Sequence, residues 1–279
     1  MKCIDCPRAC RADRDNGEFG YCGGGKLAEI SKVIDPFKYE EPCLGDVTAV
    51  FFCGCSLGCS YCQNYKIGRR GSGKTYTDAE LARLFDGAHG AIDLVTPSHY
   101  LSAIERALPL RTRASSFIYN TSGYETTAAV KRASAFTDVF LTDFKYGDPE
   151  TARRFSNAPD YCETAAAALE QMRRTGDEWA VENGRRILKR GMIVRHLVLP
   201  GRVENSLFAL DVIAERAGTN TILSLMSQFT PNGVGEPSAR LKKIEYKIAV
   251  EHSLKLGFGV GYFQDFASAD GAYTPEFDR

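Results

Sequence analysis

The segment "VTAVFFCGCSLGCSYCQN" (47–64) joins an apolar run to a loop that holds four cysteines. The run 47–52 contains mainly β-branched and aromatic residues, so it predicts a buried strand. Similar runs follow along the chain, and segments with helical periodicity lie between them. In the first of these, Thr77 and Glu80 form a capping-box pattern. The other predicted strands are 91–95, 115–120, 138–144, 191–201, 221–227 and a short final one at 258–263.

Strands that alternate with helices predict right-handed βαβ units and a parallel sheet, hence an α/β fold. Six main strands are too few for a closed eightfold barrel, so we expect a partial (β/α)6 TIM-like barrel rather than a doubly wound sheet. We expect the core domain at 46–279. Residues 1–45 are rich in Gly and Cys and weakly periodic, which predicts an irregular N-terminal extension held by ligands. The cysteine loop follows the first predicted barrel strand, at the end where catalytic groups belong.

The overall composition excludes some classes of partner. The 279 residues include 35 Lys and Arg against 35 Asp and Glu, without basic blocks, which argues against nucleic acid as the main partner. No apolar run is long enough for a bilayer and the first residues contain no apolar signal region, so we expect no membrane association and a cytoplasmic location. Nine of the ten cysteines lie in the first 62 residues. In a reducing compartment they predict metal ligands more readily than disulfides.

Cys55, Cys59 and Cys62 follow the spacing C-x3-C-x2-C. Three thiolates in one loop can hold three irons of a [4Fe–4S] cluster. The fourth iron then keeps an open position, as a metal site does when a substrate must bind the metal. The alternative is a zinc site that takes Cys53 or Cys43 as a fourth ligand.

Tyr61 precedes the last of these cysteines, and the pattern C-x3-C-x-aromatic-C resembles the radical S-adenosylmethionine (radical SAM) superfamily. Further segments resemble its pyruvate formate-lyase activating enzyme-like subgroup, over most of the chain from Cys6 to about Pro231. These segments are "CPRAC" (6–10), "LVTPSHY" (94–100), "YNTSGYE" (119–125), "TDFKYG" (142–147), "RHLVLPG" (195–201) and "SLMSQFTP" (224–231). The resemblance implies that a [4Fe–4S] cluster on Cys55, Cys59 and Cys62 cleaves S-adenosylmethionine (SAM) reductively. The products are methionine and a 5′-deoxyadenosyl radical, which abstracts hydrogen.

The resemblance also implies further cofactor-binding residues. Tyr61 would contact the adenine. Relatives carry a Gly-Gly-Glu segment for the SAM amino group where this chain has "DLVTPSHY", so Thr96 is our candidate there, with Ser98 and His99 as the other polar groups. The complete set of cofactor-binding candidates is Tyr61, Asn64, Thr96, Asn120, Thr121, Asp143, Lys145 and Arg195.

Three of these candidates carry charge. Asp143 and Lys145 occupy alternate positions, which share a face of a strand. They form either a pair in the cofactor pocket or a partly buried ion pair at the mouth of the barrel. Arg195 lies in an apolar strand and therefore needs an anion; the resemblance makes the SAM carboxylate its partner. His196 should point to the opposite face and pack outside the barrel.

Cys3, Cys6, Cys10 and Cys22 form a second set with the spacing C-x2-C-x3-C-x11-C. Four thiolates suit a structural zinc ion or an auxiliary [4Fe–4S] cluster, and an extension without metal is the remaining alternative. Cys43 and Cys53 are either further ligands or small apolar side chains.

The expected function is that of a radical SAM enzyme similar to activating enzymes, which installs a glycyl radical on a partner protein. A reductant such as flavodoxin or ferredoxin would supply the electron. Two alternatives stay open: hydrogen abstraction from a different peptide or a small molecule, and a metal-binding protein without catalysis.

Overall fold

The computed structural model describes residues 2–68, 73–173 and 176–266; the remaining parts of the expected domain 46–279 lie outside the described residues. In the described chain ten strands form a sheet in the order β10-β9-β8-β6-β5-β4-β2-β1-β3, with β7 paired to β8. Neighbouring strands from β2 to β10 are parallel. Within these residues β3 and β10 are the two edges, so the sheet is not closed. The strands are β1 (Ala28–Lys38), β2 (Asp46–Phe52), β3 (Lys74–Tyr76), β4 (Ala91–Val95), β5 (Phe117–Thr121), β6 (Val139–Asp143), β7 (Glu178–Glu182), β8 (Arg185–Leu197), β9 (Ile222–Met226) and β10 (Gly261–Phe263).

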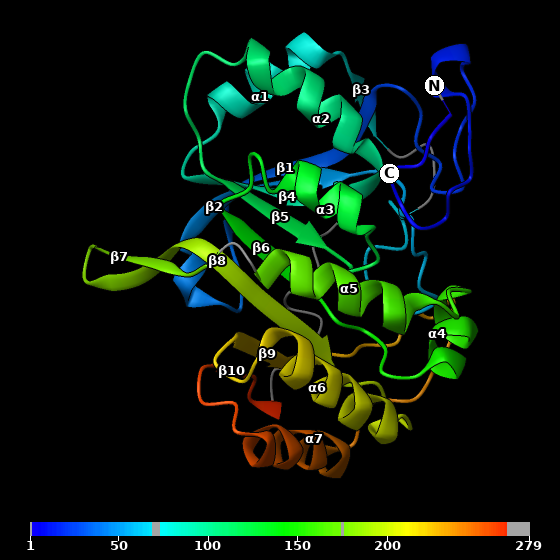
Figure 1. Cartoon of the computed structure of the whole chain (residues 1–279), viewed down its shortest axis with the longest axis vertical. Helices are drawn as coiled ribbons and strands as arrows, with labels where there is room; N and C mark the ends of the chain where they lie inside the picture. Colours follow the sequence, from blue (N-terminus) through cyan, green and yellow to red (C-terminus); the bar gives the residue numbers. More distant parts are fainter. Residues whose placement is uncertain (1, 69–72, 174–175, 267–279) are drawn as a thin grey trace.

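Helices connect the parallel strands, which confirms the predicted α/β class (Figure 1). The capping box predicted for the first helix is present: the Thr77 hydroxyl accepts from the amide of Glu80, whose carboxylate accepts from the amide of Thr77. No helix in the described ranges is long and apolar enough to span a bilayer. The helices are α1 (Asp78–Gly87), α2 (Leu101–Ala107), α3 (Thr127–Ala133), α4 (Pro149–Ser156), α5 (Tyr161–Arg173), α6 (Val203–Ala217) and α7 (Lys243–Leu256).

The two faces of the sheet have different partners, because successive side chains of a strand point to opposite sides. On one face Tyr119, Phe140 and Val194 pack against the helices. Each such buried apolar side chain contributes about 1.5–3 kcal/mol. On the other face, here called the inner face, Ile118 and Leu141 pack against Cys43 and Leu44 and related side chains. The segment that follows β1 therefore covers the part of the inner face nearer the N-terminal ends of the parallel strands. The part at their C-terminal ends is left to the site described below.

The expectation that residues 1–45 are irregular is wrong for Ala28–Lys38. This stretch forms β1, which pairs antiparallel with β2 and with β3. Ala28 and Ile30 are buried at alternate positions, a period-two pattern that the nearby Gly and Cys residues outweighed in the sequence. Among the described residues before β1, the regular structure is limited to the 3-10 turn Arg14–Asn16.

Candidate functional site

A cavity of about 400 Å³ lies on the inner face, at the C-terminal ends of β4, β5, β6, β8 and β9. This volume is within the range of small-molecule sites. The structure brings the predicted cofactor-binding residues together around it. The cavity is lined by Cys55, Cys59 and Cys62 and by all eight further candidates: Tyr61, Asn64, Thr96, Asn120, Thr121, Asp143, Lys145 and Arg195.

The cysteine loop leaves β2 through two glycines in the left-handed region, Gly54 (φ 83°) and Gly58 (φ 66°), where a side chain is unfavourable. The Cys55 sulfur accepts from the amides of Leu57 (3.4 Å) and Gly58 (3.5 Å). Burial raises the pKa of Cys62 to about 12. A metal that binds here must therefore displace the thiol proton.

Two distant segments hold the backbone of this loop. The Arg8 guanidinium, from the N-terminal extension, donates to the carbonyl of Ser56 at 2.9 Å. From the segment after β9, the side-chain amide of Asn232 donates to the carbonyls of Ser60 (2.8 Å) and Cys62 (3.3 Å). The positions of the cysteines are thus fixed from both ends of the chain. Sequence analysis missed both residues: Arg8 lies within the segment "CPRAC" but was given no role there, and Asn232 follows the last of the quoted segments.

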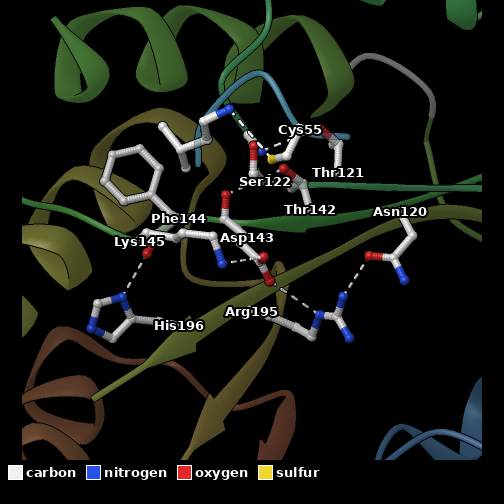
Figure 2. A network of polar contacts seen from close by, with 12 residues as sticks. Cys55, Asn120, Thr121, Ser122, Thr142, Asp143, Phe144, Lys145, Arg195 and His196 are labelled. Atoms are coloured by element: carbon white, nitrogen blue, oxygen red, sulfur yellow. Dashed lines mark hydrogen bonds and ion pairs between the residues drawn. The ribbon is translucent and has the colours of Figure 1, made fainter. Parts of the chain in front are cut away.

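Asp143 lies between two cations on the cavity wall (Figure 2). Its carboxylate accepts from Lys145 Nζ at 2.6 Å and lies 3.3 Å from Arg195 Nε. Arg195 also donates to the side-chain oxygen of Asn120 at 2.6 Å. Burial raises the pKa of Asp143, but Lys145 and Arg195 lower it by more, so that the net shift is downward.

Both expectations for these residues therefore describe the same arrangement: Asp143 and Lys145 form an ion pair, and this pair lines the cavity. Asp143 supplies the anion that buried Arg195 needs. Arg195 also lies near Glu41 and Glu40; burial lowers its pKa, but these carboxylates and Asp143 raise it by more.

His196 points away from the cavity, as predicted (Figure 2). Its ring nitrogens lie 2.6 Å from the carbonyl of Phe144 and 2.9 Å from the hydroxyl of Ser206. Burial lowers the pKa of His196 to about 4, so the ring is neutral at physiological pH. Its role is to tie β8 to α6 behind the site.

Below the charged group, a buried polar layer continues the site along the inner face. The Tyr39 hydroxyl donates to the carboxylate of Asp93, and the amide of Asn120 donates to the same carboxylate at 3.1 Å. Burial raises the pKa of Asp93 to about 6. Sequence analysis missed Tyr39 and Asp93. Asp93 could have been found, because it is a charged residue inside the apolar strand "AIDLV", which is the argument that singled out Arg195. Tyr39 carries no local signal.

Thr96 follows directly after β4 and has a φ of 60°. A β-branched residue is a marked outlier in this region, and such strain persists only where the surroundings enforce it. Here the amide of Thr96 donates to the carbonyl of Asn120 at 2.8 Å. The strained backbone places Thr96 on the cavity wall.

Tyr61 lines the cavity but is only 5% exposed. Its ring contacts those of Phe155 (5.9 Å between centroids), Phe229 (6.1 Å) and Tyr146 (6.4 Å). The side chain is therefore part of the core under the cysteine loop. Its contact with adenine stays a prediction.

The N-terminal cysteines lie apart from this cavity: of the described residues that line it, none is Cys3, Cys6, Cys10 or Cys22. Cys53 is buried and its carbonyl lies 2.7 Å from Nε2 of His99. Burial lowers the pKa of His99 to about 4. His99 therefore packs between the extension and the loop and does not face the cavity.

A zinc ion would need four ligands at about 2.0–2.3 Å, whereas a [4Fe–4S] cluster would bind each sulfur at a different iron. In the described ranges, no group of three or more His, Cys, Asp or Glu side chains is arranged to hold a metal ion. Cys55, Cys59 and Cys62 line one cavity, and the metal group that they would bind stays a prediction.

Comparison with known proteins gives one informative similarity. No family model matches the chain. An uncharacterized protein of Methanocaldococcus jannaschii is 25% identical over 243 residues, which cover 82% of this chain. The chain spans 66% of the length of that relative. The relative's description names no activity, so a functional assignment rests on the site itself.

Proposed function

We propose that this protein is a radical SAM enzyme whose [4Fe–4S] cluster is held by Cys55, Cys59 and Cys62. The observation that carries the proposal is the cavity that these thiols share with the charged group of Asp143, Lys145 and Arg195. The bound cluster and SAM would together supply a 5′-deoxyadenosyl radical after one-electron reduction. The chain itself would position SAM, neutralise its charge and exclude water.

Different residues around the cavity would bind different groups of SAM. Lys145 and Arg195 place cationic donors on the cavity wall, and such donors suit a carboxylate such as that of SAM. In the described chain, Lys145 Nζ has one hydrogen-bond partner, Asp143, and so keeps donors for a ligand.

Thr96 follows β4 and lines the cavity, where its hydroxyl could bind the amino group of SAM. Asn120 and Thr121 line the cavity at the end of β5, but the Thr121 hydroxyl donates to Glu125 at 2.6 Å and the Asn120 side chain is hydrogen-bonded to Arg195 and Asp93.

We interpret the sheet as a partial (β/α)6 barrel formed by β2, β4, β5, β6, β8 and β9, with β10 added at one edge. The position of the cavity at the C-terminal ends of these strands supports this interpretation, because barrel enzymes place their sites there. We also propose a cytoplasmic location, where low-potential electron carriers such as flavodoxin or ferredoxin can reduce the cluster.

The more specific proposal is an activating enzyme that abstracts hydrogen from a glycine of a partner protein. Its support is the resemblance of the segments around Cys62, Asn120, Asp143 and Arg195 to activating enzymes. The segment "DLVTPSHY" in place of Gly-Gly-Glu favours, as the second candidate, a different peptide or small-molecule substrate.

Anaerobic reconstitution tests the radical SAM proposal. The protein is loaded with iron and sulfide, reduced with dithionite and incubated with SAM, and 5′-deoxyadenosine is measured. We expect cleavage by the wild type and by Cys162→Ala, whose cysteine lies outside both sets, and none by Cys59→Ala. A fully loaded wild type that leaves SAM intact would overturn the proposal and favour a metal-binding protein without catalysis.

A separate measurement decides between the substrates. A glycyl radical in a partner protein, seen by electron paramagnetic resonance (EPR) after incubation with the loaded enzyme, would establish the activating role. Cleavage of SAM with 5′-deoxyadenosine that carries hydrogen from a peptide or small molecule would favour the second candidate.

A further inference from the structure

We propose that the cavity has a second compartment, lined by Phe37, Tyr39, Phe51 and Val95, which binds an aromatic ring of the substrate together with a hydroxyl or N–H group on that ring. The inference rests on the proposed function in one respect, because it takes the ring to belong to the molecule that loses hydrogen. The four side chains lie outside the set assigned to the cluster and SAM. The position of the compartment, its aromatic wall and the direction of its hydrogen bonds support the proposal.

The compartment lies at the side of the cavity formed by β1 and β2. Phe37 belongs to β1, Tyr39 follows this strand, and Phe51 lies in β2; all three line the cavity. Asp143 and Arg195 come instead from β6 and β8, and β5 and β4 lie between β6 and β2 in the sheet. A ligand held by the charged group would therefore leave the side at β1 and β2 to another molecule.

Three rings form one wall of the compartment. The Phe37 ring lies nearly edge-on to those of Tyr39 (4.8 Å between centroids, 75° between planes) and Phe51 (5.9 Å, 84°). Phe37 and Tyr39 are only half-buried and line the cavity, so part of each ring stays open to a ligand. Edge-to-face contacts of this kind favour a further aromatic ring. The wall therefore suits an aromatic group better than a polar one.

The polar end of the compartment offers an acceptor and no donor. The Tyr39 hydroxyl donates its one proton to the Asp93 carboxylate and accepts from the side-chain amide of Asn120 at 3.1 Å. The phenolic oxygen keeps a second lone pair for a ligand. Asn120 is also committed, because its amide donates to Asp93 at 3.1 Å and its oxygen accepts from Arg195 at 2.6 Å. A ligand that contacts Tyr39 here must bring the donor itself.

A buried carboxyl behind Tyr39 strengthens this preference. Asp93 is fully buried, and among the described residues its Oδ1 atom has no hydrogen-bond partner. This end of the compartment thus holds an acceptor in excess, and a donor that approaches it is stabilised. An anionic group at the same place would lie beside a carboxyl with which it shares no proton. We therefore expect a neutral ring with a donor rather than a carboxylate.

The compartment differs from the place expected for the adenine of SAM. The resemblance assigns the adenine to Tyr61, whose ring lies 5.9 Å from that of Phe155 in the core cluster of the helix-covered face. Phe51 and Val95 belong to another apolar cluster, against which Phe37 packs. A ring at Phe37 would therefore be bound in addition to SAM.

Isothermal titration calorimetry with three small probes tests the inference. Phenol carries both the ring and the donor, anisole has the ring without a donor, and cyclohexanol has the donor without an aromatic ring. The full chain is titrated without metal, after a check of its folding by circular dichroism, so the result does not depend on SAM cleavage. We expect phenol to bind about three- to tenfold more tightly than either other probe. No binding of phenol, or equal binding of anisole or cyclohexanol, would overturn the inference.

Variants locate the bound phenol. Phe37→Ala removes the central ring and should weaken phenol and anisole by about tenfold. Phe208→Ala, the matched control, removes a ring of α6 that is 51% exposed and should change neither. Tyr39→Phe keeps the ring but not the acceptor, so it should bind phenol and anisole equally. Unchanged binding of phenol by folded Phe37→Ala, or an unchanged preference in Tyr39→Phe, would contradict the proposed compartment.

The loaded enzyme tests whether the compartment stays free when SAM is bound. With the cluster unreduced and SAM saturating, phenol should bind as tightly as it binds the metal-free chain. Displacement of phenol by SAM would make the compartment part of the SAM site and overturn the inference. Failure to cleave SAM would instead refute the proposed function and leave the phenol titration unaffected. The tripeptide Gly-Tyr-Gly separates the two sources of such a ring: binding tighter than that of phenol assigns it to a peptide side chain, and weaker binding to a small molecule.

Discussion

The backbone amide of Cys55 donates to the carbonyl oxygen of Cys22 at 3.2 Å. Gly54, the residue before Cys55, adopts a φ of 83°. A Cβ atom on Gly54 would lie 2.3 Å from the Cys22 carbonyl oxygen and 3.2 Å from His99 Nε2. The N-terminal extension and the cysteine loop are therefore packed backbone against backbone. The geometry of the first proposed ligand depends on a segment more than thirty residues earlier.

Gly54→Ala should separate these two segments, and Gly58→Ala is its matched control. Both glycines have a left-handed backbone, but nothing lies within 4 Å of a Cβ at Gly58. We expect Gly58→Ala to lower the free energy of unfolding by about 1 kcal/mol. Gly54→Ala should cost about 1–3 kcal/mol more because of the clash and should lower the iron content of the loop site. Urea unfolding and iron analysis of both variants check this; equal losses would show that the Cys22 contact does not hold the loop.

Asp143 should be the most sensitive member of the charged group, because it neutralises two cations. Asp143→Asn leaves Lys145 without its anion and removes the carboxylate that lies 3.3 Å from Arg195 Nε, and we expect the free energy of unfolding to fall by about 3 kcal/mol. Lys145→Met should cost less, since Asp143 keeps its ion pair with Arg195. The order is measured by urea unfolding of the metal-free proteins at pH 7. A larger loss for Lys145→Met would contradict the central role of Asp143.

Much of the fold could be predicted because its signals are local. The strand 91–95 was expected with the bounds that β4 has, and the capping box of α1 follows from two residues. Two missed elements also carry local signals. Asp148 caps α4 ahead of Pro149, and Asn183 and Gly184, both with positive φ, form the turn between β7 and β8. β1 was missed because the Gly and Cys residues before it outweighed its short period-two pattern, and its pairing with β2 cannot be read from the sequence.

The residues of the site also fall into those that could be predicted from the sequence and those that could not. Residues in recognisable segments, such as Cys59 and Asp143, could be assigned from the sequence and do meet around one cavity. Tyr39 could not, because its partner Asp93 lies 54 residues away. Arg8 and Asn232 act on the loop through backbone carbonyls, which leave no trace in the side chains that they contact.

Thr96→Gly should relieve backbone strain at the cavity. Glycine adopts a φ of 60° without the clash of a β-branched side chain, so we expect unchanged stability or a gain of about 1 kcal/mol. Thr142→Gly, at a buried strand position of β6, should instead lose about 1 kcal/mol. If the Thr96 hydroxyl binds SAM, the first variant should also bind SAM more weakly. Urea unfolding and equilibrium binding of SAM to the loaded protein measure both effects; a loss of stability equal to that of Thr142→Gly would contradict the strain.

Asp93 should make the stability of the protein depend on pH. Burial raises its pKa from 3.8 to about 6 in the folded protein, against the opposing effects of Tyr39 and Asn120. A raised pKa stabilises the fold fully below about pH 4, and this contribution is lost as the pH rises through 6. The loss for this carboxyl amounts to about 3 kcal/mol, from 1.4 kcal/mol for each pKa unit.

Asp93→Asn isolates that contribution, because asparagine keeps an oxygen for both donors but does not titrate. Glu41 and Glu125 are also buried with raised pKa values, but they titrate in both proteins and cancel in the difference. We therefore expect the free energy of unfolding of Asp93→Asn, relative to the wild type, to increase by about 3 kcal/mol between pH 4 and pH 8. Urea unfolding at several pH values, with both proteins metal-free, gives this difference directly. A difference that stays constant with pH would mean that Asp93 titrates as an ordinary carboxyl and that the polar layer beneath the cavity is open to water.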